Sequence, residues 1–163
     1  VFTVTVMDNL RYGNLAAGDE ELIRAAELVC ADGFIRALPH GYDTVLTEGG
    51  AMLSQGEKQL LALARTMASD PKILILDEAT SSVDTKTERE LQEGVNRMLK
   101  GRTSFIVAHR LSTIQNADQI LVIDQGRFAA CGRQEELLNT CPLYRTMWEQ
   151  YQSTAAFAGK EAN

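Results

Sequence analysis

The sequence predicts an α/β protein in which parallel strands are connected by helical crossovers and followed by an edge hairpin. Residues 73–76 form a continuous apolar run with the character of a strand buried on both faces, residues 103–107 are expected to form a second buried strand, and an amphipathic segment separates them. Residues 119–124 and 127–131 flank the pair Gln125-Gly126, which is the pattern of a β-hairpin. This order indicates a parallel sheet, because parallel neighbours need a crossover connection.

The helices are predicted from caps and apolar periodicity. Asp19 is expected to cap a helix that runs to about Cys30. Its apolar stripe consists of Leu22, Ile23, Ala26 and Val29. A second helix is expected from Ser54 to near Ser69, before an Asp-Pro pair.

The second half of the chain contains two further predicted helices. Asp84 is expected to cap an amphipathic helix, and residues 142–151 form the last one, opened by a proline. The inner face of the first consists of Leu91, Val95, Met98 and Leu99, before Gly101. We expect residues 152–163 to be a disordered tail. Residues 1–6 alternate like a strand, whereas residues 5–9 are equally suited to start a helix.

Composition limits the class of protein. The chain has 163 residues, 45% of them hydrophobic and 23% charged, which is typical of one globular domain. The net charge of −6 argues against a nucleic-acid partner. No apolar run approaches the ~18 residues of a membrane span. Cys30, Cys131 and Cys141 lie far apart and are expected to be reduced thiols. The start at Val1, without methionine or a leader, suggests a fragment.

The strongest local signal is the pair of carboxylates that follows residues 73–76. Ligands of open α/β sheets bind beyond the carboxyl ends of the strands. Asp77 is therefore placed to coordinate Mg²⁺, together with phosphate and water oxygens. Glu78 is placed to orient or deprotonate an attacking water. Taken alone, the same pattern fits the start of a solvated loop equally well.

Two further segments carry chemistry. In LSQGE at residues 53–57, Ser54 and Glu57 have the spacing of a capping box at the start of a helix. The free N–H groups of such a helix start suit a phosphate, although a capped helix alone explains the pattern as well. His109 lies two residues after Val107, at the end of the second expected strand, so it shares the sheet edge with Asp77. Either a phosphate contact or a structural role is open for it.

The order and spacing of these segments resemble the ATP-binding domain of ABC exporters. LSQGE is similar to the family's signature motif, and ILILDE at residues 73–78 is similar to its Walker B strand. SSVD at residues 81–84 resembles the D-loop, and HRLST at residues 109–113 resembles the H-loop. Thr47 to Gly50 (TEGG) resembles the short X-loop. The resemblance covers essentially residues 1–151.

The resemblance implies a role for each matched residue. Asp77 would assist Mg²⁺ coordination, Glu78 would be the catalytic carboxylate, and His109 would lie near the γ-phosphate. The signature residues Ser54, Gln55, Gly56 and Glu57 would meet ATP held by a second ATP-binding domain in a head-to-tail dimer. Asp84 would communicate across that dimer, and the X-loop would contact a transmembrane domain on the cytoplasmic face of the cell membrane.

The resemblance also implies a division of the chain. Residues 1–68 would be the α-helical subdomain with the signature helix, and residues 69–151 the second half of a RecA-like P-loop NTPase core. No G-x-x-x-x-G-K-[ST] motif, whose amides and lysine would hold the phosphates, occurs in the sequence. We therefore expect the chain alone to be inactive, with an unpaired apolar sheet face that lowers its solubility.

Two positions depart from the usual signature. Glu57 stands where the family usually has glutamine, and Gln55 stands where it usually has glycine. Glu57 adds negative charge near the expected phosphate, and we expect its side chain to turn back towards the backbone of Ser54.

Three functions remain as alternatives. The first is that the chain is the catalytic half of an exporter ATPase. The second is that it is a shortened product or a relic that only binds a partner. The third is that it belongs to an ABC ATPase without a membrane domain. The X-loop and the acidic charge argue against the last of these. The resemblance specifies neither the transported substrate nor whether the dimer is homomeric.

Overall fold

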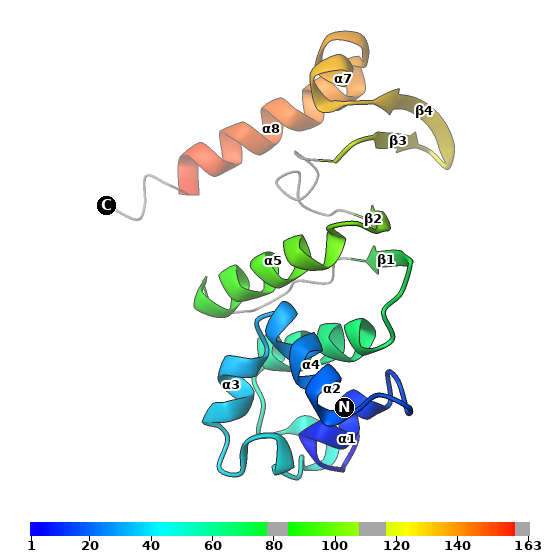
Figure 1. Ribbon diagram of the computed structural model, residues 1–163. Helices are drawn as coiled ribbons and strands as arrows, with labels where there is room; N and C mark the ends of the chain where they lie inside the picture. The colour runs from blue at the N-terminus through cyan, green and yellow to red at the C-terminus, as the bar shows by residue number, and fades with distance from the viewer. Residues whose placement is uncertain (78–84, 108–116, 159–163) are drawn as a thin grey trace. The chain divides into compact units, whose positions relative to one another are not determined.

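The computed structural model describes residues 1–77, 85–107 and 117–158. Of the predicted site residues, Glu78, Asp84 and His109 lie outside these ranges. The chain divides into two compact units, Val1–Phe105 and Ile106–Asn163, and each is described by itself (Figure 1). None of the helices in the described ranges has the length and apolar character of a membrane-spanning segment.

The first unit begins with a bundle of short helices around one longer helix. Its elements are α1 (Val6–Arg11), α2 (Asp19–Leu28), α3 (Asp32–Ala37), the 3₁₀ turns η1 (Gly41–Asp43) and η2 (Glu48–Gly50), and α4 (Gln55–Ala68). Both α1 and α2 pack on α4. Their contact buries Leu10, Leu22, Ala26, Leu60, Leu61 and Ala64. Helix α4 is thus the centre of this bundle and agrees with the helix predicted from Ser54.

The structure settles two questions about helix starts. It decides between the two alternatives for residues 5–9, and it corrects the predicted cap of α2. Thr5 caps α1 through its hydroxyl oxygen, which accepts the Asp8 N–H at 3.0 Å, so the helical alternative for residues 5–9 is confirmed. The cap of α2 is Gly18 and not Asp19, so that prediction was wrong. The Glu21 carboxylate accepts the Gly18 N–H at 3.0 Å, which makes Asp19 the first helical residue.

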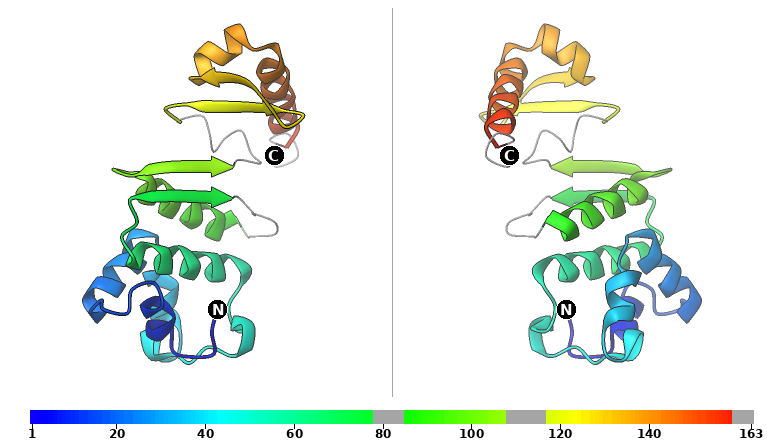
Figure 2. Two further views of the ribbon diagram at one scale, coloured as in Figure 1. Left: turned by 90° about the vertical axis from the view of Figure 1, so that its right-hand side faces the viewer. Right: turned by 90° about the vertical axis from the view of Figure 1, so that its left-hand side faces the viewer.

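Strands β1 (Ile73–Asp77) and β2 (Thr103–Val107) form a two-stranded sheet, and α5 (Thr85–Leu99) connects them. Figure 2 draws both arrows in the same direction, as the predicted crossover requires. The amide of Thr103 donates to the carbonyl of Lys72 at 3.2 Å, next to the strands. A parallel sheet with a helical crossover is therefore confirmed.

The sheet buries only one of its faces. Leu74 is 3% exposed and belongs to the same core cluster as Leu91 and Met98 of α5. On the opposite face, Ile73 is 61% and Ile75 is 75% exposed. The expected exposed apolar face of the sheet is therefore confirmed, whereas burial on both faces, which the apolar run alone suggested, is wrong for this chain, because helices cover the Leu74 face alone within the described residues.

The second unit contains a hairpin and two helices. Its elements are β3 (Ile120–Asp124), β4 (Arg127–Gly132), α7 (Gln134–Thr140) and α8 (Pro142–Ala158). The strands pair antiparallel, and Gln125 and Gly126 turn between them with φ of 48° and 74°, as a type I′ turn requires. The predicted hairpin is confirmed.

The last helix is longer than the sequence indicated. Residues 153–158 continue α8, although we expected a disordered tail from residue 152. This stretch contains three alanines and no proline or glycine, so nothing in it interrupts a helix. Residues 159–163 lie outside the described ranges.

Candidate functional site

The signature segment forms a complete capping box at the start of α4. The hydroxyl oxygen of Ser54 accepts the Glu57 N–H at 3.2 Å, and the Glu57 carboxylate accepts the Ser54 N–H at 2.8 Å. The expectation that Glu57 turns back to the Ser54 backbone is thus confirmed. The carboxylate remains at the positive end of the helix dipole, where a negative charge is favourable.

The capping box leaves the first turn of α4 able to meet a ligand. Ser54 and Gln55 are exposed, whereas Gly56 is buried and Leu53 is only 5% exposed. Leu53 therefore anchors the segment in the core while its neighbours face outwards. The Glu57 N–H is taken by the Ser54 hydroxyl, whereas the N–H groups of Gln55 and Gly56 have no acceptor within the helix, so these two suit an anion.

The loop before the signature has a specific backbone shape. Gly49 and Gly50 adopt φ of 65° and 64°, a left-handed conformation that favours glycine. The Gly50 N–H donates to the Thr47 carbonyl at 2.7 Å, and the Leu53 N–H donates to the Gly50 carbonyl at 2.9 Å. These bonds connect Thr47–Gly50 directly to the signature segment, so the two share one local fold.

The segment that leads into this loop is held by residues 1–6. The Leu46 N–H donates to the Val4 carbonyl at 3.0 Å, and the Val6 N–H donates to the Thr44 carbonyl at 3.0 Å. Thr5 and Val45 form an antiparallel bridge between these bonds. The strand-like alternation of residues 1–6 was therefore a sign of this short pairing.

A buried side-chain amide, that of Asn9, attaches residues 2–5 to α1, and the sequence analysis did not identify it. Asn9 on α1 is fully buried and hydrogen-bonds to the backbone of residues 2–5. A single asparagine has no characteristic spacing, so no sequence pattern pointed to this residue.

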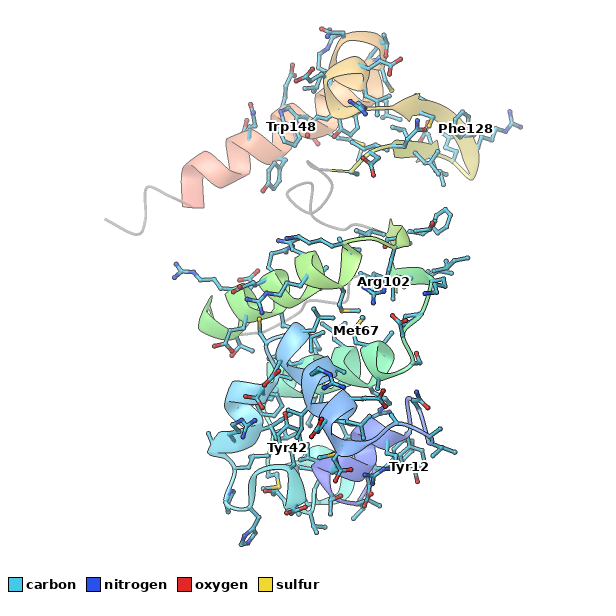
Figure 3. The ribbon with its side chains drawn as sticks, viewed as in Figure 1. Tyr12, Tyr42, Met67, Arg102, Phe128 and Trp148 are labelled. Carbon is cyan, nitrogen blue, oxygen red and sulfur yellow. The ribbon has the colours of Figure 1, made fainter. Side chains whose placement is uncertain are left out.

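A polar cluster lies before the loop, on α3 and η1. The Asp32 carboxylate accepts the Tyr42 hydroxyl at 2.7 Å and the Arg36 Nε–H at 2.8 Å. Burial raises the pKa of Asp32, but the hydrogen bonds from Arg36 and Tyr42 outweigh burial and lower it overall. Burial, followed by the bond to Asp32, raises the pKa of Tyr42. The cluster fixes η1 to α3 (Figure 3 labels Tyr42).

Asp77 is the last residue of β1, and its side chain is exposed. No group of three or more His, Cys, Asp or Glu side chains suited to a metal ion exists in the described part of the chain. One carboxylate at the carboxyl end of a strand still fits Mg²⁺, since this ion takes most of its ligands from phosphate and water. The structure describes Asp77 and residues 53–57, but not their geometry with Glu78, Asp84 or His109.

Comparison with known families identifies one match. The family model for "ABC transporter" matches residues 4–81. A solved bacterial Atm1-family ABC exporter with ATP bound superposes with a TM-score of 0.80 at 43% sequence identity. That match covers 92% of this chain and 26% of the exporter chain.

Curated relatives agree with this match. YfiC, an ABC transporter ATP-binding protein of Bacillus subtilis, is 49% identical over 149 residues, which are 91% of this chain and 25% of that protein. The ATP-dependent lipid A-core flippase of Desulfotalea psychrophila is 45% identical over 148 residues, which are 91% of this chain and 26% of that protein. This chain therefore spans about a quarter of the length of these relatives.

Proposed function

Because this chain belongs to the ABC transporter family, as a portion of an exporter-type ATP-binding domain, we propose that it contributes to the ATP hydrolysis that drives transport across a membrane. The capped, outward-facing start of α4 is the single observation that carries the proposal. In this proposal Ser54, Gln55 and Gly56 bind the γ-phosphate of ATP that a second ATP-binding domain holds. A helix start with free N–H donors has the charge and geometry for that contact.

Glu57 has a defined place in this proposal. Its carboxylate accepts the Ser54 N–H at 2.8 Å, so it caps the helix and is turned towards the backbone of Ser54. The negative charge nevertheless lies within one turn of the proposed phosphate contact. We infer that this signature binds ATP and is weaker than one with glutamine at the same position.

The carboxyl ends of β1 and β2 are the proposed place of the chemistry. Asp77 would hold Mg²⁺ through its exposed carboxylate, and Glu78, the next residue, would orient the attacking water. His109 follows β2 by two residues and would donate a hydrogen bond to the phosphate. Because the sequence contains no G-x-x-x-x-G-K-[ST] motif, we propose that the 163-residue chain alone does not turn over ATP.

The proposal also names partners and location. A second ATP-binding domain would pair head to tail with this one, with Asp84 at the contact between them. The loop Thr47–Gly50 would contact a transmembrane domain and communicate closure of the dimer, which places the chain on the cytoplasmic face of a membrane. A nucleic-acid partner is not part of the proposal, given the net charge of −6.

The proposal is tested with two substitutions in the transporter that contains this chain. Glu78→Gln should retain ATP binding and reduce turnover by about a thousandfold, because water activation is lost. Glu20→Gln, at a side chain that is 89% exposed on α2, is the matched control. Turnover within a few-fold of the unmodified protein would assign the catalytic role to another residue.

The second substitution addresses the signature. Ser54→Arg should block ATP-driven dimer closure, because a bulky cation would occupy the phosphate contact. Ser69→Arg places the same side chain at the exposed opposite end of α4 and should leave closure intact. Equal closure in the two variants would contradict the signature assignment.

A further inference from the structure

The N-terminal residues are attached to the bundle through one buried side chain. The Asn9 side-chain oxygen accepts the Phe2 N–H at 2.9 Å, and its Nδ2 donates to the carbonyls of Phe2 and Thr5, each at 3.0 Å. The amide therefore pairs with both backbone groups of Phe2, as a neighbouring strand would. Asn9 itself is fully buried, whereas Phe2 is 47% exposed, so these bonds connect the core to the surface segment.

A second side chain connects this pair to α4. The Arg65 Nη2 lies 3.4 Å from the Asn9 side-chain oxygen, and its guanidinium carbon is 5.1 Å from the centre of the Phe2 ring. The ring of Tyr12, which follows α1, also packs on Phe2, with 4.5 Å between the two ring centres. Residues from the N-terminal segment, α1 and α4 thus hold the same ring.

The N-terminal segment also reaches the other end of α4. A Cβ placed on Gly50 would lie 3.1 Å from the Val1 side chain and 3.5 Å from the side chain of Lys58. Lys58 and Arg65 are two helical turns apart and therefore lie on the same face of α4. Val1 therefore lies against Gly50, near Lys58, and Phe2 lies against Arg65.

We propose that Asn9 is a positioning residue that holds residues 1–6, the loop Thr47–Gly50 and the signature helix as one body. Residues 4–6 are bonded to residues 44–46, which continue into the loop, and Arg65 connects Asn9 to α4 itself. A displacement of the N-terminal segment is then transmitted to Ser54 rather than absorbed in a flexible joint. This proposal rests on the proposed function, in which Ser54 acts on ATP in the opposite subunit.

A polar residue is needed at this position because of what it faces. An apolar side chain at position 9 would leave the Phe2 N–H without its acceptor. The carbonyls of Phe2 and Thr5 would each lose one donor, but they keep the backbone N–H groups of Val4 and Asn9 at 2.9 and 3.0 Å. The N-terminal segment would then be attached to α1 less firmly, because the Phe2 N–H would have only water as its acceptor. Residues 44–46, which lead into the loop, would then lose their pairing with residues 4–6.

The test compares Asn9→Ala and Arg65→Lys with the control Asn14→Ala. Asn14 also accepts a backbone N–H, from Ala16 at 3.1 Å, but is exposed and lies outside the cluster. Hydrogen exchange of the intact protein is followed by mass spectrometry. Asn9→Ala should accelerate exchange of residues 44–57 by about tenfold or more, and the control should not. Acceleration confined to residues 2–9 would overturn the proposal, because the segments would then move independently.

Turnover separates a positioning role from a purely structural one. In the transporter, Arg65→Lys should lower kcat by about tenfold, with the affinity for ADP and the melting temperature nearly unchanged. An unchanged kcat, in a protein that Ser54→Arg inactivates, would overturn the proposal. If Ser54→Arg has no effect while Asn9→Ala still accelerates exchange at residues 44–57, the coupling stands and the proposed function of the signature has failed.

Discussion

The helices before β1 and the strands that follow them differ in how completely their apolar side chains are buried. In the helical bundle, Leu10, Leu22, Leu60 and Leu61 are all 0% exposed. In the strands, Ile75 of β1 is 75% exposed, Phe105 of β2 is 54% exposed and Ile123 of β3 is 68% exposed. The bundle therefore completes its own core with residues of this chain, whereas the strands present apolar faces that the described residues do not cover.

This difference indicates where the chain is self-sufficient. A helix needs to bury one stripe, and α4 finds α1, α2 and α5 on its sides. A strand in a parallel sheet needs cover on both faces, and β1 has cover on the Leu74 face alone. The signature helix, which belongs to the self-sufficient region, is therefore expected to keep its geometry in this chain.

The largest effect is expected in the centre of the bundle. Leu61→Ala should lower the free energy of unfolding by about 2–5 kcal/mol, because it removes a fully buried side chain and leaves a cavity. Leu15→Ala is the control, since Leu15 is 79% exposed and should change stability by less than about 0.5 kcal/mol. Urea unfolding followed by circular dichroism measures both. Equal losses would mean that the bundle is not the stable part of the chain.

The next effect concerns the close contact between the end of α1 and α4. A Cβ on Gly13 would lie 2.0 Å from the Arg65 carbonyl oxygen, which is backbone and cannot rotate away. Gly13→Ala should therefore destabilise the chain by about 1–3 kcal/mol. At Gly33, in α3, a Cβ would meet nothing within 4 Å, so Gly33→Ala should be neutral or stabilising. A neutral Gly13→Ala would show that α1 can separate from α4 without cost.

The capping box of the signature should have an intermediate effect. Ser54→Ala removes the oxygen that accepts the Glu57 N–H and should cost about 1 kcal/mol. Glu57→Gln retains an acceptor for the Ser54 N–H and should change the free energy of unfolding by only about 0.3 kcal/mol. The same substitution should strengthen the proposed contact with ATP. Thermal unfolding measures the first effect, and ATP-driven closure of the transporter measures the second. Weaker closure in Glu57→Gln would contradict the inferred effect of the charge.

Acid should loosen the loop side of the bundle through Asp32. Its pKa is lowered overall by Arg36 and Tyr42, although burial acts in the opposite direction. A lowered pKa in the folded state contributes stability above the unfolded value of about 3.9, and this contribution is lost as the pH falls below it. Asp32→Asn should remove that part of the acid dependence, by less than about 1 kcal/mol. An identical pH profile of unfolding in the two proteins would exclude Asp32 as the cause.

Local sequence patterns were sufficient for the elements that depend on neighbours in the chain. The spacing of Ser54 and Glu57 predicted the capping box, and Gln125 with Gly126 predicted the hairpin, because both are decided within a few residues. Helix α3 (Asp32–Ala37) was missed because its six residues make less than two helical turns, which is too short to show the helical period in the sequence. The exact first residue of α2 was not predicted, because it depends on which side chain accepts the N–H groups at the helix start.

Other features depend on residues that are distant in the chain. The apolar run at residues 73–76 predicted a strand correctly, but its burial depends on what covers each face, which a strand's own sequence does not contain. Asn9 was missed because its partners are backbone groups, and these leave no mark in the sequence. The geometry among Asp77, Glu78, Asp84 and His109 remains a prediction, since only Asp77 lies in the described ranges.

The smallest effect on stability is expected on the open face of β1, where it separates folding from association. Ile75→Thr keeps a β-branched side chain, so the strand propensity is retained and the free energy of unfolding should change by less than about 0.5 kcal/mol. The substitution should nevertheless reduce self-association, because Ile75 is 75% exposed beside Ile73 at 61%. Light scattering against concentration measures association, and urea unfolding provides the stability. A loss of about 2 kcal/mol or more would mean that Ile75 is covered in solution by other residues of the chain, and the contrast between bundle and strands would then no longer hold.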